Sequence, residues 1–192
     1  QFDRQSWETP LEQIDLITPA QRRQVLSEWN DTRCDYSEDE HIASLLEAQV
    51  ALTPDNIACA DRHRQLTYCQ LNLQANQLAA ALSARGVGHG ACVALCLDRS
   101  VELLVGIWAI LKLGAAYLPV DPAFPDDRLD YILQDSRAEV IICHQAYRHR
   151  VAAPGRRLVV LDDESLRHEL ELLSDENMAR QISPNDLAYV IY

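Results

Sequence analysis

Short apolar runs alternate with helical segments along the central part of this chain. The runs 91–97, 115–120 and 139–143 are almost wholly apolar, and the segments between them, 101–113 and 126–134, have the length and periodicity of helices. Strands that are apolar along their whole length are typical of parallel sheets that are covered by helices. The alternation therefore predicts an α/β fold with a largely parallel sheet and helices on both faces.

The first 40 residues have a different character. They are polar and acidic, with one helical stretch at 19–29, for which Thr18 is the expected N-cap and Pro19 the first helical position. We interpret residues 1–40 as a linker and residues 41–192 as part of a folded domain. Because no Met begins the chain, we expect it to be a piece of a longer protein.

The remaining elements follow from periodicity and turn signals. Residues Ile42, Leu45, Leu46, Gln49 and Val50 repeat at helical spacing, and Thr53-Pro54-Asp55 ends that helix. The other expected elements are a hairpin of 57–60 with 65–68, helices at 69–84 and 165–173, and strands at 158–161 and 187–192. A strand at 187–192 on an exposed sheet edge would favour self-association.

Charge and hydropathy exclude several classes of partner. The net charge of −12 argues against nucleic acid and against an anionic membrane surface, since both are bound through clustered Lys and Arg. The longest apolar stretch, 101–120, is interrupted by Lys112 and Gly114, which indicates a helix followed by a strand rather than a membrane span. The N-terminus lacks the pattern of a signal peptide, so we expect a cytoplasmic protein.

Six cysteines are present, but their setting does not favour a disulfide framework. Cys59, Cys92, Cys96 and Cys143 lie in apolar, strand-like runs, where cysteine usually acts as a small buried hydrophobe. Reduced thiols agree with a cytoplasmic location.

Three candidate ligand sites have a stronger structural explanation. The cluster Gly86-Val87-Gly88-His89-Gly90 lies after a helix and before a strand, the reverse of a phosphate-binding loop, so we interpret it as a helix exit. Cys92 and Cys96 would lie roughly 13 Å apart along a strand, too far to share one metal ion. His144 and His149 are also a poor pair of metal ligands.

Two charged features also have a structural explanation. Asp162-Asp163-Glu164 follows a strand and could hold a cation, although an acidic turn before a helix is the commoner explanation. Lys112, the only lysine, is expected in the last turn of its helix, where it would complement the helix dipole without a catalytic role.

Several longer motifs resemble the adenylation domains of nonribosomal peptide synthetases, which belong to the adenylate-forming enzyme superfamily. LTYCQL (66–71) is similar to their first core motif, with Gln70 in place of the usual Glu, and LKLGAAYLPVDP (111–122) with FPDDRLDYILQDS (124–136) resembles the second motif and its continuation. LAYVIY (187–192) looks like the strand before the third motif. Residues 17–32 resemble the linker after a condensation domain, and 41–58 resemble the first helix and strand of the adenylation domain.

This resemblance implies a parent enzyme that uses ATP and Mg²⁺ to form an aminoacyl adenylate. It then passes the amino acid to the phosphopantetheine thiol of a carrier domain, with condensation and carrier domains of the same synthetase as partners. In the family, the phosphate loop, the amino-acid pocket, the ribose-binding aspartate and the catalytic lysine all lie beyond the position of Tyr192. The resemblance thus assigns no catalytic, cofactor-binding or metal-binding residue to this chain. We expect no ligand on this part alone, and no activity.

Two alternatives remain open at this stage. An acyl- or aryl-CoA ligase would share the scaffold, although such ligases have no condensation domain upstream and so would lack the linker-like segment at 17–32. The other alternative is a non-catalytic, degenerate module that only mediates contacts within a synthetase.

Overall fold

The chain divides into two units, 1–37 and 38–192, each described by itself. The structure is a computed structural model and describes residues 17–35 and 40–192. In the first unit, α1 (Pro19–Arg23) continues into a π-helical turn, η2 (Gln24–Glu28). Thr18 caps α1 as expected, since its hydroxyl accepts the Gln21 amide at 3.2 Å. The predicted helix is confirmed, and the described side chains of this unit are exposed.

The second unit begins with a helix and a hairpin. These are α2 (Ile42–Leu52), β1 (Ile57–Ala60) and β2 (Gln65–Thr67), and the two strands pair antiparallel as predicted. The apolar repeat of α2 is only partly buried. Ala43 and Leu46 are buried, whereas Ile42 and Leu45 are each 50% exposed. The inward face of α2 is therefore offset from the repeat seen in the sequence.

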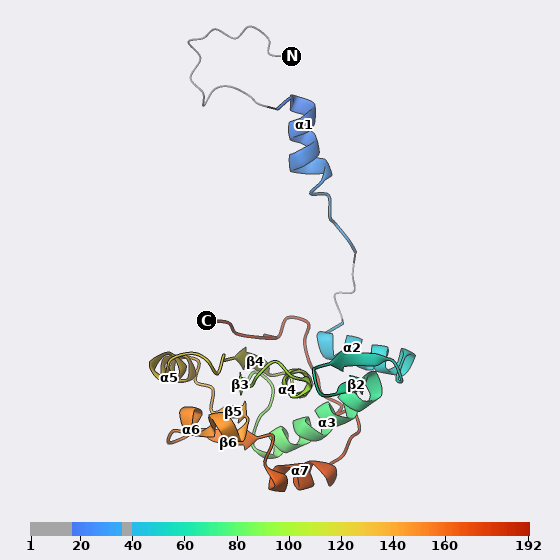
Figure 1. The fold of residues 1–192 in the computed structure, drawn as a ribbon. Helices are drawn as coiled ribbons and strands as arrows, with labels where there is room; N and C mark the ends of the chain where they lie inside the picture. The colour runs from blue at the N-terminus through green and yellow to red at the C-terminus, as the bar shows by residue number, and fades with distance from the viewer. Residues whose placement is uncertain (1–16, 36–39) are drawn as a thin grey trace. The chain divides into compact units, whose positions relative to one another are not determined.

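Four parallel strands form the predicted main sheet. They are β3 (Cys92–Cys96), β4 (Ala116–Pro119), β5 (Val140–Cys143) and β6 (Arg157–Val160), in the spatial order β4-β3-β5-β6 (Figure 1). All three pairings are parallel. Each strand is near its predicted position, and the pairing confirms the parallel α/β class.

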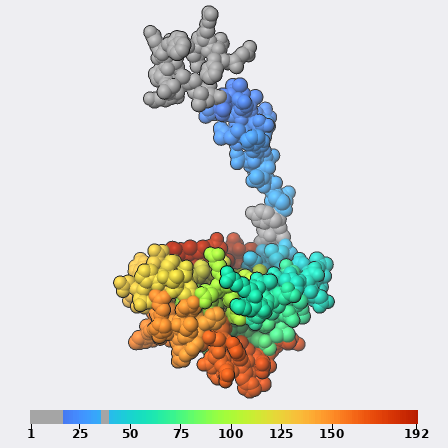
Figure 2. Space-filling model, viewed as in Figure 1, coloured from blue at the N-terminus to red at the C-terminus, as the bar shows by residue number. Residues whose placement is uncertain are grey.

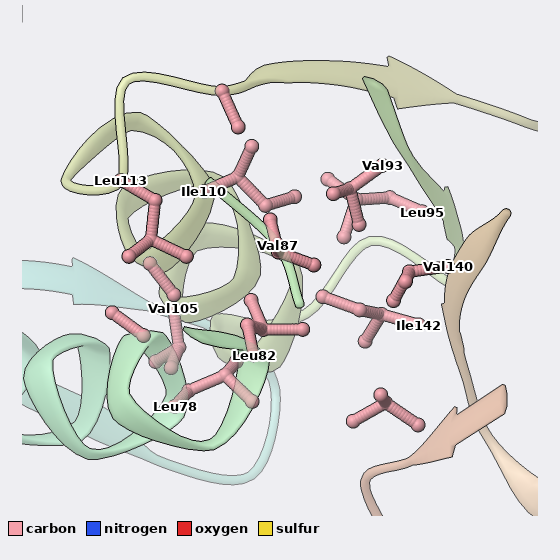
Figure 3. Packing of buried hydrophobic residues seen from close by; sticks show 14 of the residues in the cluster. Leu78, Leu82, Val87, Val93, Leu95, Val105, Ile110, Leu113, Val140 and Ile142 are labelled. Carbon is pink, nitrogen blue, oxygen red and sulfur yellow. The ribbon is translucent and has the colours of Figure 1, made fainter. Parts of the chain in front are cut away.

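Helices cover both faces of this sheet. On one face, α3 (Tyr68–Ala84) and α4 (Val101–Leu111) pack against the alternate strand residues Val93, Leu95, Val140 and Ile142 (Figure 3). Helix α7 (Glu164–Glu171) lies beside α3 (Figure 1). On the other face, α5 (Asp126–Asp135) and α6 (Arg148–Val151) enclose Ala94, Cys96, Ile141 and Cys143. The period-two alternation of strand side chains thus supplies two separate cores.

Two short elements were not predicted. A 3-10 turn, η3 (Gln145–Tyr147), leads directly into α6 after β5. Both are too short to produce a helical repeat in the sequence. None of the helices in the described ranges is long and apolar enough to cross a membrane.

The strand predicted at 187–192 is wrong, since only Tyr189 forms a bridge to β4. The Tyr117 amide donates to the Ala188 carbonyl, and the Val190 amide donates to the Tyr117 carbonyl, both at 3.0 Å. On this side of β4 the next donor along the ladder would be residue 119, which is a proline without an N–H. Pro119 therefore interrupts the ladder. In Figure 2 this last segment, in dark red, lies on the surface between α5 (yellow) and α2 (cyan).

Candidate functional site

The carboxyl edge of the sheet is the place to look for a site. The chain passes from β3 to β4 on one side and then crosses to β5 on the other side of β3. In open α/β sheets, ligands bind beyond the carboxyl ends of the strands, next to such a reversal of strand order. The polar residues just after the four strands are Asp98, Asp121, His144 and Asp162.

The three aspartates at this edge each hold a neighbouring loop. Asp98 accepts a hydrogen bond of 2.7 Å from the Tyr147 hydroxyl, which raises the pKa of that tyrosine. Asp121 accepts from the Ala123 amide at 2.8 Å, and Asp162 from the Gln145 amide at 2.7 Å. These carboxylates stabilise the scaffold rather than point together at a common ligand.

An arginine braces the loop that follows β4. Arg150, in α6, donates from Nε to Asp126 Oδ1 at 2.8 Å and from Nη2 to the Phe124 carbonyl at 2.7 Å. It also hydrogen-bonds to the Pro122 carbonyl. One guanidinium group therefore fixes the part of the chain that carries the second resemblance motif, and it does so from a helix that was not predicted.

A hollow of about 820 Å³ lies where β3 and β5 end, against the hairpin and the first turns of α4. Its wall is fixed by Asp61. One carboxylate oxygen accepts the amides of His63 and Arg64 at 2.7 and 3.0 Å, and the other accepts the Val101 amide at the start of α4 at 3.1 Å. These hydrogen bonds, the His63 amide first, lower the pKa of Asp61 to about 2.

Asp61 gives a testable pH dependence. Because its pKa is lower in the folded chain than the ordinary 3.8, its contribution to stability is fully present above about pH 4 and is lost as the pH falls towards 2. We expect Asp61→Asn to flatten this part of the curve of unfolding free energy against pH. Urea denaturation between pH 2 and 7 measures it, and an unchanged acid limb in the variant would contradict the assignment.

Sequence patterns contain no signal for the contact between Asp61 and the start of α4. Asp61 followed by polar residues indicates a turn, but its contact with Val101 spans 40 positions and depends on how the hairpin meets α4. The hollow itself was also missed, because its lining comes from separate segments of the chain.

The structure places the predicted candidates as follows. Gly86 and Gly90, with φ of +85° and +76°, carry the chain out of α3, which confirms the helix-exit interpretation. Cys92 and Cys96 both face the α5 side of the sheet, and all six cysteines are free thiols. His144 precedes η3 and His149 lies in α6.

The acidic turn is also a structural feature. Asp163 caps α7 by accepting the Ser165 amide at 2.8 Å, while Asp162 holds Gln145. Across residues 17–35 and 40–192, no three His, Cys, Asp or Glu side chains gather as metal ligands would. Together with the engaged aspartates, this donor set does not fit Mg²⁺, and we assign none of these residues to it.

The expectation for Lys112 needs correction. It does cap the end of α4, but it is only 3% exposed and its Nζ lies 2.5 Å from Glu47 Oε1 and 3.1 Å from Asn177 Oδ1. Its charge is therefore compensated by a partly buried ion pair with a residue of α2 rather than by the helix dipole alone. Burial lowers the pKa of Lys112, against the opposing effect of Glu47.

Comparisons with known proteins agree with this architecture. The family model described as "AMP-binding enzyme" matches residues 46–192. The chain is 41% identical over 182 residues to one of the subunits of mycosubtilin synthase from Bacillus subtilis, and 40% identical over 183 residues to tyrocidine synthase 3 of Brevibacillus parabrevis. Each match covers 95% of this chain, but only 7% and 3% of the respective relatives, so the chain spans a small part of their length.

Solved structures show the same fold. The crystal structure of the nonribosomal peptide synthetase FmoA3 matches with a TM-score of 0.77 and 29% identity, over 88% of this chain and 18% of that one. The N-terminal domain of FACL13 from Mycobacterium tuberculosis matches with a TM-score of 0.71 and 25% identity, over 79% of this chain and 41% of that domain. The fold is thus that of the N-terminal part of adenylate-forming enzymes.

Proposed function

Because this chain belongs to the family of AMP-binding enzymes, we propose that it supplies the N-terminal scaffold of an amino-acid-activating adenylation domain in a nonribosomal peptide synthetase. The parent domain would form an aminoacyl adenylate from ATP and an amino acid, releasing pyrophosphate, and load a carrier-domain thiol. The observation that carries this proposal is the match to peptide synthetases along 95% of the chain.

That coverage also bears on the alternatives. A match over 95% of the chain includes most of residues 1–40, which are outside the family model. It supports a linker joined to a condensation domain, a feature that free-standing acyl-CoA ligases lack. The likeness to FACL13 bears on the fold alone, and the two classes are expected to share that scaffold.

The proposed division of labour leaves chemistry to the rest of the domain. A structure of FmoA3 is described as an AMPPNP-bound form, which supports the use of ATP by the parent. The residues of this chain keep the sheet, the two cores and the braced loops in place, so that groups elsewhere are positioned for reaction. From the likeness to peptide synthetases we also infer that the parent uses Mg²⁺, loads a phosphopantetheine thiol and works in the cytoplasm.

A chimera tests this proposal. We expect that replacing the matching 182 residues of the mycosubtilin synthase relative with this sequence retains amino-acid-dependent ATP–pyrophosphate exchange, because the two segments are 41% identical and this chain packs two apolar cores against its sheet. The amino acid that stimulates exchange should remain that of the recipient. Radioactive pyrophosphate incorporation into ATP, measured with each amino acid in turn, provides the result.

The isolated 192-residue chain is the matched control, and it should give no exchange above background. A folded chimera without exchange, or one with a new amino-acid preference, would contradict a purely scaffolding role. Exchange by the isolated chain would contradict it equally.

A further inference from the structure

The hollow at the ends of β3 and β5 is lined by acidic side chains that have hydrogen-bond partners and by two arginines that have none in the part of the chain that the structure describes. Three acidic side chains line it, and each already has partners. Asp61 accepts three backbone amides, Asp98 accepts the Tyr147 hydroxyl, and Glu102 forms an ion pair with Arg64. Within the described residues, none of these carboxylates makes an ion pair with a cation other than Arg64.

Two arginines in the same hollow remain unmatched. Arg62, from the hairpin turn, and Arg99, from the loop after β3, both line it. Among the residues that the structure describes, neither makes a hydrogen bond or an ion pair. Two unpaired guanidinium groups in one hollow favour an anion.

The two guanidinium groups and the apolar side of the hollow indicate which class of anion it would bind. A guanidinium fork matches phosphate in a bidentate manner, and two such groups suit a dianion better than a monoanion. The start of α4 contributes nothing further, since Asp61 already binds it. The volume of about 820 Å³ is larger than a phosphate needs, and Leu103 and Leu104 add an apolar side to the lining.

We propose that this hollow binds a small phosphate monoester, with its phosphate held by Arg62 and Arg99 and its organic part against Leu103 and Leu104. The position agrees with the general preference of α/β sheets for ligands at a reversal of strand order. The inference is argued from the lining of the hollow alone and does not rest on the proposed function.

The test is a titration of the 192-residue chain, labelled with ¹⁵N, with three probes: phenyl phosphate, inorganic phosphate and benzoate. We expect phenyl phosphate to shift the amides of 62–64 and 98–104 and to bind more tightly than inorganic phosphate. Benzoate, a monoanion with the same ring, should bind most weakly. Binding of both phosphates should weaken as salt is raised, because the two arginines are exposed to solvent.

Variants assign the binding to the two arginines. Arg62→Ala and Arg99→Ala should each weaken phenyl phosphate binding about tenfold, the effect of one lost charge-assisted hydrogen bond. Arg167→Ala is the matched control, because Arg167 is also exposed and lies outside this hollow. It should leave the affinity unchanged, and the amide spectra of all three variants show whether they are folded.

Three results would overturn the proposal, and the first two need no variant. Benzoate could bind as tightly as phenyl phosphate, the shifted amides could lie elsewhere, or Arg167→Ala could weaken binding as much as Arg99→Ala. The exchange assay on the chimera is independent of this titration, so failure here is distinguishable from failure of the proposed function.

Discussion

Replacing Glu47 by alanine is expected to destabilise the chain by about 2–4 kcal/mol, because it leaves the Lys112 ammonium buried without its counter-charge. Lys112 is 3% exposed, and its remaining contact is the amide oxygen of Asn177, at 3.1 Å. The Glu47 side chain is 31% exposed, which places the loss near the lower end of that range. Urea denaturation at pH 7 measures the change in the free energy of unfolding.

The matched controls remove the positive charge of Lys112 instead of leaving it without a partner. Lys112→Met should cost less than about 1 kcal/mol, since Glu47 can reach water, and Glu47→Ala combined with Lys112→Met should recover most of the loss. In Glu47→Ala the pKa of Lys112 should fall further below 10.5, so that the folded state binds fewer protons than the unfolded state. The stability of that variant should then rise with pH towards 10.5. A double variant no better than Glu47→Ala would contradict the ion-pair explanation.

Leu82→Ala is the second large effect, with an expected loss of about 3 kcal/mol from transfer and cavity terms. Leu82 is 0% exposed and lies in α3 within the core shown in Figure 3. Leu172, at the end of α7, is 75% exposed and provides the same substitution without a cavity.

We expect Leu172→Ala to change stability by no more than about 0.5 kcal/mol. Thermal and urea unfolding of both variants provide the comparison. Equal losses at the two positions would show that α3 and the sheet do not form the stabilising core.

The fold was largely predictable because its strands are buried on both faces. A run such as 140–143 is expected to be apolar throughout when helices cover both faces of the sheet, and the structure confirms this for β5. A cap residue predicted a helix start equally well at Thr18, whose hydroxyl accepts the Gln21 amide at 3.2 Å. Apolar runs and cap residues each depend on a few neighbouring positions, so they can be recognised in a sequence.

What could not be predicted depends on contacts between distant segments. Lys112 meets Glu47 and Asn177 across 65 positions each, so a lysine that resembles a helix-end cation is in fact buried between helices. The hollow next to Asp61 likewise combines a hairpin, a strand end and a helix start. Short elements such as α6 escape because four residues carry no periodicity, although Arg150 in α6 braces the loop after β4.

Pro119 has a consequence for how this sheet meets other chains. On the outer side of β4, the two hydrogen bonds of Tyr117 and the contact between the rings of Tyr117 and Tyr189, 5.7 Å apart, hold the last segment. A foreign strand that displaced this segment would find no donor at position 119, so it could not extend a continuous ladder. The same imino acid that shortens the pairing within the molecule therefore protects this edge from intermolecular sheet growth, even though Leu187 and Ile191 are largely exposed.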